Sequence, residues 1–494
     1  MKNLFLLSGF VWFAFITCSG QSLFTLKEKE NPWKDNYFDL SSMEHYKEWG
    51  AYNVHDPACK KIGDYYYVYS TDAIFAENKK EALEKGVPLG YIQVRRSKDL
   101  VNWEFVGWAF PNIPEEAVSW VRNQTNGRGA VNIWAPYIMP YQTIYRLYFC
   151  VSAFGKQASY IGLAESASPE GPWVQKGCVV KTSNESLMNA IDPSIVEDPR
   201  TGRWWMHYGS FFGGLYCVEL NPETGLPVRE NDQGRLIARR ANYTKDNLEA
   251  PEIIYHPELK KYFLFSSYDP LMTTYNVRVG RSDKPEGPFF DFDGLNIKDT
   301  LNHFPLLTAP YRFENHPGWA GTGHCGIVND GDGQFFMLHQ ARLSPYNMLM
   351  VLHVRQVFFT RSGWPVVSPE RYAGTPSQRF RSADMAGEWE IIRVWEPVGK
   401  RNLEAGQVLP GESGLQINEC NVSARWVLDH NGNIPNRGKW QFSDAKQLLN
   451  IRIDDENIKD LIIFAGHDWE NEKETILFTG LDAKGRSVWG KKIN

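Results

Sequence analysis

Three acidic residues lie in short, similar motifs and could form one reactive group. The motifs are His55-Asp56-Pro57, Ile191-Asp192-Pro193 and Glu249-Ala250-Pro251. A lone Asp-Pro most often serves only to cap a turn, so no single motif carries weight. Carboxyl groups that are brought together push their pKa values apart, so that one can donate a proton while another accepts one. Function therefore depends on whether the fold brings Asp56, Asp192 and Glu249 together.

Each motif lies about one hairpin, roughly ten residues, before a run of aromatic and aliphatic residues. Two further motifs, Trp134-Ala135-Pro136 and Gly323-His324, stand in the same place before two more runs. Apolar residues fill nearly every position of the runs, which predicts strands buried on both faces. The five runs span residues 65–70, 145–149, 204–210, 262–267 and 335–339.

A second strand and a turn follow each run, for example Pro-Glu-Gly-Pro at 169–172 and the related Lys-Pro-Glu-Gly-Pro at 284–288. Five repeats of strand and hairpin predict an all-β fold whose main part, residues 31–376, is a five-bladed β-propeller. The innermost strands of propeller blades face a common axis. The motifs would then converge on one funnel, and the three acids would occupy equivalent repeat positions in one pocket.

The pattern changes after the propeller, and residues 380–494 predict a second, smaller domain. Short strands at 387–390, 425–428, 439–442, 449–453 and 487–489 alternate with polar turns, as in a small antiparallel barrel or sandwich. No cluster of catalytic residue types occurs there. We expect this domain to support the propeller, with glycan binding as the alternative.

Residues 1–20 have the pattern of a secretory signal peptide. Lys2 precedes an apolar run over 4–16 that is too short to span a bilayer comfortably, and Ser19-Gly20 permits cleavage before Gln21. This predicts a secreted or periplasmic protein with no later transmembrane segment. The alternative is an outer-membrane lipoprotein with its lipid on Cys18, although Thr17 is bulkier than the residue usual at that position.

Six cysteines remain after this segment, at wide and irregular spacing without a Cys-x-x-Cys pair. This argues against a zinc site or a disulfide scaffold, and buried free thiols are expected instead. The six are Cys59, Cys150, Cys178, Cys217, Cys325 and Cys420.

The composition and net charge limit the class of ligand that the protein is expected to bind. The net charge is −5 and no basic block is present, which argues against nucleic acid. The 18 Trp, 23 Tyr and 28 Phe suit a neutral ligand such as a sugar, although aromatic residues also fill cores. Hydrolysis of a glycosidic bond needs one acid to protonate the leaving oxygen and one carboxylate as base or nucleophile, and the three acids could meet that need.

An ordered series of motifs makes the chain resemble glycoside hydrolase family 43, and within it the endo-acting arabinanases, over residues 52–374. The 274–282 and 363–372 segments favour arabinanases, and the domain after residue 376 is similar to the extra barrel of two-domain members. The motifs lie at residues 55–57, 189–193, 209–212, 249–251, 274–282, 323–324 and 363–372.

The resemblance implies an inverting mechanism with Asp56 as general base, Glu249 as general acid and Asp192 orienting Glu249 and raising its pKa. Inversion needs the base and acid roughly 6.5–9.5 Å apart. Asn189 and the 210–212 stretch, which includes Ser210 and Phe211, match positions that line the sugar site in such enzymes. Trp134 is a candidate sugar platform, with a core aromatic as its alternative.

His324 matches a histidine that, in similar enzymes, reaches a calcium ion on the propeller axis through a largely hydrated shell. Calcium prefers oxygen ligands, so the residue type alone indicates a structural histidine. The calcium site is therefore an implication of the resemblance.

Two departures from the family pattern leave alternatives open. Glu252 follows Glu249-Ala250-Pro251 where an aromatic residue is common, which makes it a rival general acid. The loop around Pro270-Leu271-Met272 is short, and loops at the funnel mouth decide between endo and exo cutting. The leading hypothesis is a monomeric endo-hydrolase of α-1,5-linked L-arabinan. The alternatives are an exo-acting α-L-arabinofuranosidase or β-xylosidase, and a non-catalytic glycan-binding propeller.

Overall fold

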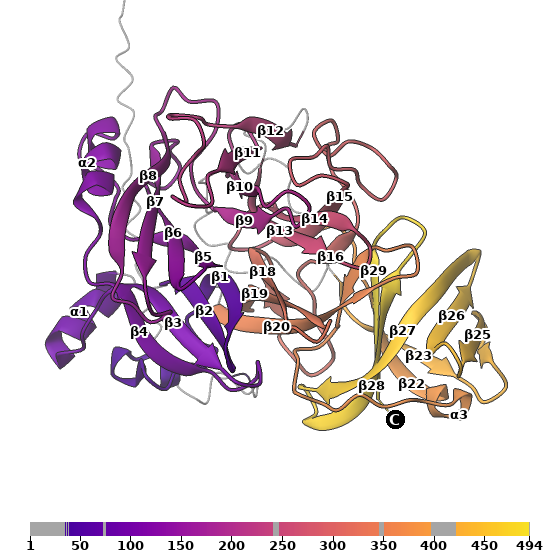
Figure 1. Cartoon of the computed structure of the whole chain (residues 1–494). Helices are drawn as coiled ribbons and strands as arrows, with labels where there is room; N and C mark the ends of the chain where they lie inside the picture. The colour runs from indigo at the N-terminus through magenta and orange to yellow at the C-terminus, as the bar shows by residue number, and fades with distance from the viewer. Residues whose placement is uncertain are drawn as a thin grey trace, which may run out of the picture.

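The computed structural model describes residues 35, 37, 39–72, 76–240, 247–344, 350–396 and 421–493. The proposed signal peptide, Cys18 and Cys420 lie outside these residues. The chain forms a ring of five antiparallel sheets followed by one eight-stranded sheet, as Figure 1 shows from indigo to yellow. The predicted propeller and second β domain are confirmed.

The first three sheets each contain four strands in sequence order, the arrangement of propeller blades. Their strands are β1 (His55–Ile62), β2 (Tyr65–Thr71), β3 (Tyr91–Ser97) and β4 (Glu104–Phe110); β5 (Trp134–Tyr141), β6 (Ile144–Ser152), β7 (Ser159–Ser166) and β8 (Val174–Thr182); and β9 (Ser194–Glu197), β10 (Trp204–Tyr208), β11 (Leu215–Leu220) and β12 (Arg235–Ala238).

The fourth blade repeats this order, and the fifth adds a short strand. Their strands are β13 (Leu248–His256), β14 (Lys261–Tyr268), β15 (Asn276–Ser282) and β16 (Leu306–Thr308); and β17 (Trp319–Ala320), β18 (Cys325–Asn329), β19 (Phe335–Leu343), β20 (Met350–Phe359) and β21 (Pro365–Val367).

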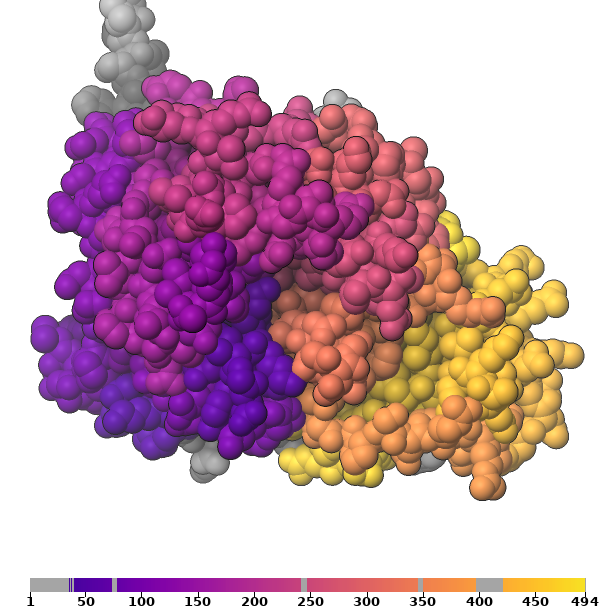
Figure 2. All heavy atoms as spheres, viewed as in Figure 1, coloured from indigo at the N-terminus to yellow at the C-terminus, as the bar shows by residue number. Residues whose placement is uncertain are grey.

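The predicted aromatic runs form the second strands of the blades, β2, β6, β10, β14 and β19, and these strands are buried almost throughout. The innermost strands contact one another in the order β1, β5, β9, β13, β18 and back to β1. Tyr52, just before β1, pairs with Val351 of β20, so the first and last blades join. The ring is therefore closed around one axis, and Figure 2 shows a hollow at the centre of the face in view.

Short helices lie outside the repeats and were not predicted. They are the 3-10 turns Asp39–Ser41 and Met43–His45, and the α-helices α1 (Ala76–Lys85), α2 (Glu115–Gln124) and α3 (Ser382–Met385). The helix α2 packs against β6 and β7 of the second blade. None of the helices in the described segments is long and apolar enough to cross a lipid bilayer.

The C-terminal sheet curls until its two edge strands, β23 and β24, contact each other. Its interior is filled by Trp389, Trp426, Trp440 and Phe478, among others. The strands are β22 (Gly387–Arg393), β23 (Ala424–Leu428), β24 (Asn433–Ile434), β25 (Gly438–Ser443), β26 (Leu448–Ile453), β27 (Glu456–Asp468), β28 (Lys473–Leu481) and β29 (Ser487–Lys492).

The two domains share one apolar core. Trp489 and Ile392 from the C-terminal domain belong to the same buried cluster as Tyr311 and Trp319 from the propeller. Trp489 is fully buried, and its ring packs edge-on against Tyr311. This continuous contact supports the predicted role of the C-terminal domain as a support for the propeller.

Candidate active site

The backbone turns the same way at the start of every innermost strand. Five equivalent residues there have a left-handed conformation, with φ between 39° and 59°. Such a conformation is uncommon outside glycine, and its repetition in all five blades marks a common design. The five residues are Asp56, Ala135, Asp192, Ala250 and His324.

This equivalence corrects one expectation. Asp56 and Asp192 occupy the repeat position as predicted, but Glu249 stands one residue before it, next to left-handed Ala250. In the register of the blades, Glu249 pairs with Ser267 where His55 pairs with Thr71. Its longer side chain still reaches the same centre as the two aspartates, because the Asp192 carboxyl accepts the backbone N–H of Ala250 at 3.2 Å.

Asp56 is buried and surrounded by donors. Its two carboxylate oxygens contact the Nδ1 atoms of His324 and His55, each at 2.8 Å, and Thr71 donates to it at the same distance. Burial would raise the pKa of Asp56, but the His324 and His55 rings hold that pKa well below its usual value. Asp56 is therefore kept ionised, as a general base must be.

Glu249 has the opposite character. Ser210 donates to one carboxyl oxygen at 2.6 Å and Tyr275 donates to the other at 2.7 Å. Burial raises the pKa of Glu249 above its usual value, although the two hydroxyl donors oppose that shift. A buried carboxyl with a raised pKa and a fixed orientation has the properties of a general acid.

Asp192 links these two groups electrostatically. Burial raises its pKa well above the usual value, and the nearby Glu249 and Asp56 carboxyls raise it further against the opposing effect of His324. The Glu249 and Asp56 carboxyls therefore both act on the pKa of Asp192, and the Asp56 carboxyl also raises the pKa of Glu249. The three acids that the sequence singled out do gather at one centre.

Glu252, the rival acid, lies deeper along the propeller axis. Ser194 donates to one of its oxygens at 2.7 Å and the backbone N–H of Ile327 donates to the other at 3.0 Å. Both oxygens of Glu252 therefore bond to the third and fifth blades. Beyond the effect of burial, the Asp56 carboxyl raises the pKa of Glu249, which places Glu249 close to the candidate base and favours it as the proton donor.

The four predicted sugar-contacting residues have different surroundings. Ser210 contacts Glu249, and Asn189 is 3% exposed with its side-chain oxygen 2.5 Å from the Ser159 hydroxyl. Phe211 is half-exposed, and Trp134 is half-buried against the core of the second and third blades. The two aromatic side chains therefore retain accessible surface, whereas Asn189 and Ser210 are engaged with the protein.

Three residues of this centre were not singled out from the sequence as functional: His55, Thr71 and Tyr275. Thr71 joins the blades, since its hydroxyl donates to Asp56 and accepts the backbone N–H of Ala135 at 2.7 Å. Tyr275 packs so tightly on Gly323 that a Cβ atom there would lie 2.3 Å from the ring. The signal for Tyr275 was its place in the 274–282 motif.

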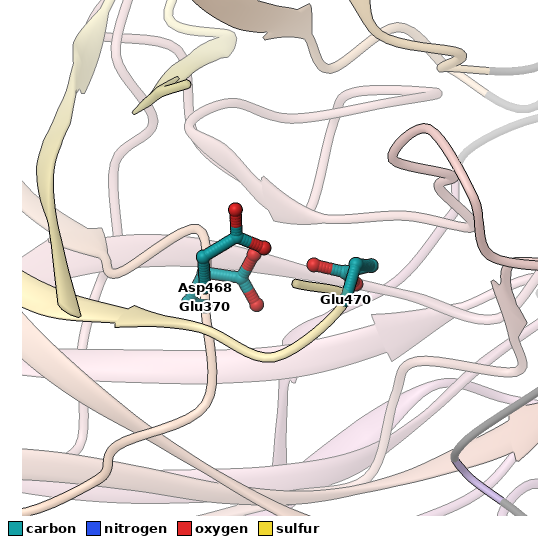
Figure 3. A group of neighbouring side chains, drawn as sticks. All are labelled: Glu370, Asp468 and Glu470. Atoms are coloured by element: carbon teal, nitrogen blue, oxygen red, sulfur yellow. The ribbon is translucent and has the colours of Figure 1, made fainter. Parts of the chain in front are cut away.

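A second group of carboxyls lies outside the funnel, and Figure 3 shows its members Glu370, Asp468 and Glu470. Their spacing could suit a metal ion. However, the Lys491 ammonium lies among them, 2.8 Å from Glu370 and 2.9 Å from Asp468. Lys491 therefore supplies the positive charge, and this group is an ionic contact between the two domains.

The cysteines agree with the prediction of free thiols. Among the described residues Cys59, Cys150, Cys217 and Cys325 are free and buried, and Cys178 is free and half-buried. None of the five forms a disulfide.

Comparison with known proteins identifies related chains. The family model described as glycosyl hydrolases family 43 matches residues 50–365, and a C-terminal lipocalin-like domain matches residues 369–490. An extracellular endo-α-(1→5)-L-arabinanase of Thermotoga petrophila is 26% identical over 488 residues, covering 89% of this chain and 93% of the relative. An extracellular exo-α-(1→5)-L-arabinofuranosidase of Cellvibrio japonicus is 29% identical and covers 67% of this chain and 90% of the relative.

The fold agrees with these matches. The crystal structure of the Thermotoga petrophila endo-1,5-α-L-arabinanase superposes with a TM-score of 0.73 at 25% identity, covering 90% of this chain and 99% of that one. The family match covers most of the chain and includes all three acids of the centre. The chain belongs to glycosyl hydrolase family 43.

Proposed function

We propose that the protein is an inverting glycoside hydrolase that cleaves α-1,5-linked L-arabinan within the chain. The observation that carries this proposal is the pairing of an ionised Asp56 with a Glu249 of raised pKa around one centre. The names of the similar proteins support arabinan as the substrate, and the endo-acting relative matches over both domains.

In the proposed mechanism Asp56 accepts a proton from the attacking water while Glu249 protonates the departing sugar oxygen. Ser210 and Tyr275 hold the Glu249 carboxyl in place through one hydrogen bond to each oxygen. Asp192 lies beside Glu249 and, through its charge, favours the protonated form of the pair. Trp134 and Phe211 offer accessible aromatic surface for a sugar ring.

We also propose that a calcium ion binds beside His324, which would hold it through a ring nitrogen and water molecules. His324 Nδ1 contacts Asp56, so Nε2 is the ring atom that could bind the ion. A bound calcium ion would add positive charge beside the acids and so favour their ionised forms. A rise in the melting temperature with calcium in the wild type, absent in His324→Gln, would support this site.

We further propose that the protein acts outside the cytoplasm on arabinan. The similar endo- and exo-acting proteins carry the description extracellular, and the apolar N-terminal segment suits export. Lipidation at Cys18 and a monomeric state remain proposals, which mass spectrometry of the mature chain and its mass in solution would test.

The decisive experiment incubates the wild type with debranched arabinan, with an aryl arabinofuranoside and with xylan. Endo cleavage predicts a ladder of arabino-oligosaccharides from the polymer at early times. Release of single arabinose units would indicate exo cleavage instead, and activity on xylan alone would contradict the substrate.

The same incubation with Glu249→Gln and Glu252→Gln assigns the general acid. Loss of turnover in Glu249→Gln with most activity kept in Glu252→Gln supports the assignment, and the reverse result overturns it. Binding of arabinan without hydrolysis by the wild type would favour a glycan-binding propeller.

A further inference from the structure

A second layer of polar groups, four side chains and one backbone N–H, joins the innermost strands next to the catalytic acids. One residue comes from the innermost strand of each blade, and we call this set the axial belt. It consists of Lys60 of β1, Tyr137 of β5, Ser194 of β9, Glu252 of β13 and Ile327 of β18.

Hydrogen bonds join the members of the axial belt across the blades. Lys60 Nζ donates to the Tyr137 hydroxyl at 3.2 Å, and that hydroxyl donates to the carbonyl of Ile195 at 2.7 Å. Ser194 Oγ donates to Glu252 Oε2 at 2.7 Å, and the N–H of Ile327 donates to Glu252 Oε1 at 3.0 Å. The belt therefore ties the first blade to the second, the second to the third, the third to the fourth and the fourth to the fifth.

The sequence leaves room for this layer. Two residues beyond the left-handed positions the five strands carry Ala58, Tyr137, Ser194, Glu252 and Gly326. Three of these residues are small, so Tyr137 and Glu252 carry the large side chains at this position. At Gly326 a Cβ atom would lie 2.6 Å from the carbonyl oxygen of Pro57, which shows how closely the first and fifth blades approach.

The axial belt contains two side chains of opposite charge, Glu252 and Lys60. Glu252 is only 5% exposed, and its burial is costly unless the charge is compensated. Burial raises the pKa of Glu252, and the Lys60 ammonium is the largest influence that lowers it. Lys60 itself is half-buried. Cys59 precedes Lys60 on β1 and Cys325 follows left-handed His324 on β18, and the two cysteines are 4% and 3% exposed.

We propose that the axial belt is a positioning device that fixes the strands carrying the catalytic acids and closes the axis beneath them. Glu252 is its central member: it lies three residues beyond Glu249, bonds Ser194 two residues beyond Asp192, and bonds Ile327 three residues beyond His324. The reacting water then enters from the substrate side alone. The positioning part of this proposal rests on the proposed function.

The positioning part is tested with Glu252→Leu, Lys60→Met, the double variant of both, and Glu252→Gln. We expect Glu252→Leu to lower kcat on arabinan by on the order of 10²-fold with KM little changed, because small displacements of catalytic groups are costly. Glu252→Gln keeps a side-chain oxygen for Ile327 and should retain most of kcat. Glu258→Leu, at an exposed glutamate of the same hairpin, is the matched control.

The double variant separates positioning from stability. Replacement of both charges by apolar side chains should restore the unfolding midpoint that either single variant lowers, because no uncompensated charge remains. We expect kcat to stay low in this variant, since the bonds to Ser194 and Ile327 are still missing. Recovery of wild-type kcat together with stability would overturn the positioning role.

Closure of the axis is tested without substrate, by the rate at which methyl methanethiosulfonate modifies Cys59 and Cys325 in peptide maps. We expect both thiols to react far more slowly than half-buried Cys178 in the wild type, and faster in Lys60→Ala. Equal rates for all three thiols in the wild type would overturn the closure. Failure of the wild type to hydrolyse arabinan would instead contradict the proposed function, and the thiol rates would still decide the closure.

Discussion

The protein buries two groups of carboxyls, one in the propeller funnel and one between the domains. In the funnel, Asp56, Asp192 and Glu249 face two imidazoles and several hydroxyl donors. Between the domains, Glu370, Asp468 and Glu470 surround the Lys491 ammonium, which is fully buried. The first group therefore faces imidazole rings and neutral hydroxyl groups, and the second faces a permanent cation.

The different partners of the two groups indicate a catalytic role for the funnel acids and a structural role for the interdomain acids. The pKa of Glu370 is raised, first by burial and then by the neighbouring Glu470 carboxyl, whereas Lys491 and the Glu370 hydrogen bond oppose burial and lower the pKa of Glu470 to about 2. Glu370 therefore tends to keep its proton while Glu470 is ionised, and the Lys491 ammonium compensates the negative charge of Glu470. In the funnel the pKa of Asp56 is lowered while those of Asp192 and Glu249 are raised, and the two Asp56 oxygens contact imidazoles.

The largest effect should follow the loss of the funnel acids. Glu249→Gln and Asp56→Asn should each lower turnover of arabinan by about 10³–10⁴-fold, because each removes one partner of acid–base catalysis. The unfolding midpoint should hold in Glu249→Gln, which leaves no new buried charge, and should fall modestly in Asp56→Asn, because His324 loses its counter-charge. Rate measurements test the loss of turnover, and thermal melts followed by circular dichroism test the unfolding midpoint. A variant that fails to fold would mean that the replaced acid has a structural role, as the interdomain carboxyls do.

The interdomain group should respond in the opposite way. Lys491→Met should lower the free energy of unfolding by about 3–5 kcal/mol, because the buried carboxylates lose their counter-charge. Turnover per folded molecule should change little. Urea titration followed by intrinsic fluorescence measures the loss, and Lys484→Met, at an exposed lysine, is the control. A kcat loss that exceeds the folded fraction would show that this group also acts on catalysis.

A smaller effect should sharpen the assignment within the funnel. Activity requires ionised Asp56 and protonated Glu249, so it falls at low pH as Asp56 gains a proton and at high pH as Glu249 loses one. Tyr275 lowers the pKa of Glu249 by donating to its ionised form. Tyr275→Phe should therefore move the alkaline limb to higher pH and lower kcat by about 10-fold.

The control for this variant is Tyr255→Phe, at a half-buried tyrosine of the same blade. A pH profile unchanged in Tyr275→Phe, with kcat reduced, would mean that Tyr275 orients Glu249 without affecting its proton.

The sequence predicted most of the propeller because each blade repeats a local pattern. The aromatic runs and the motifs before them became second and innermost strands, and the three acids converged as expected. The strands β27 and β28 were not predicted, although Leu461-Ile462-Ile463-Phe464 and Ile476-Leu477-Phe478 are apolar runs of the kind that predicted other strands. The short helices lie in connections that have no counterpart in the other blades.

The sequence could not reveal contacts made between distant segments. Thr71 joins Asp56 to the second blade, and Tyr275 reaches Glu249 from the neighbouring strands, yet neither has a distinctive local pattern. Glu252 was a rival for the general acid because it lies only three residues from Glu249. The left-handed residue Ala250 lies between the two glutamates, and the sequence does not reveal how this turn separates their side chains. Lys491 likewise meets carboxyls from residues 370, 468 and 470, which only the packed domains bring together.

The left-handed residue that opens each innermost strand has a consequence for protein engineering. Asp56, Asp192 and His324 carry reactive groups at this position, whereas Ala135 and Ala250 carry only a methyl group on the same backbone. Asparagine and aspartate tolerate this conformation better than alanine does. Ala135→Asn or Ala135→Asp would therefore place a polar side chain at the fourth of these five positions, on a backbone conformation that both residues tolerate. It would do so beside the buried cluster to which Ala135 belongs.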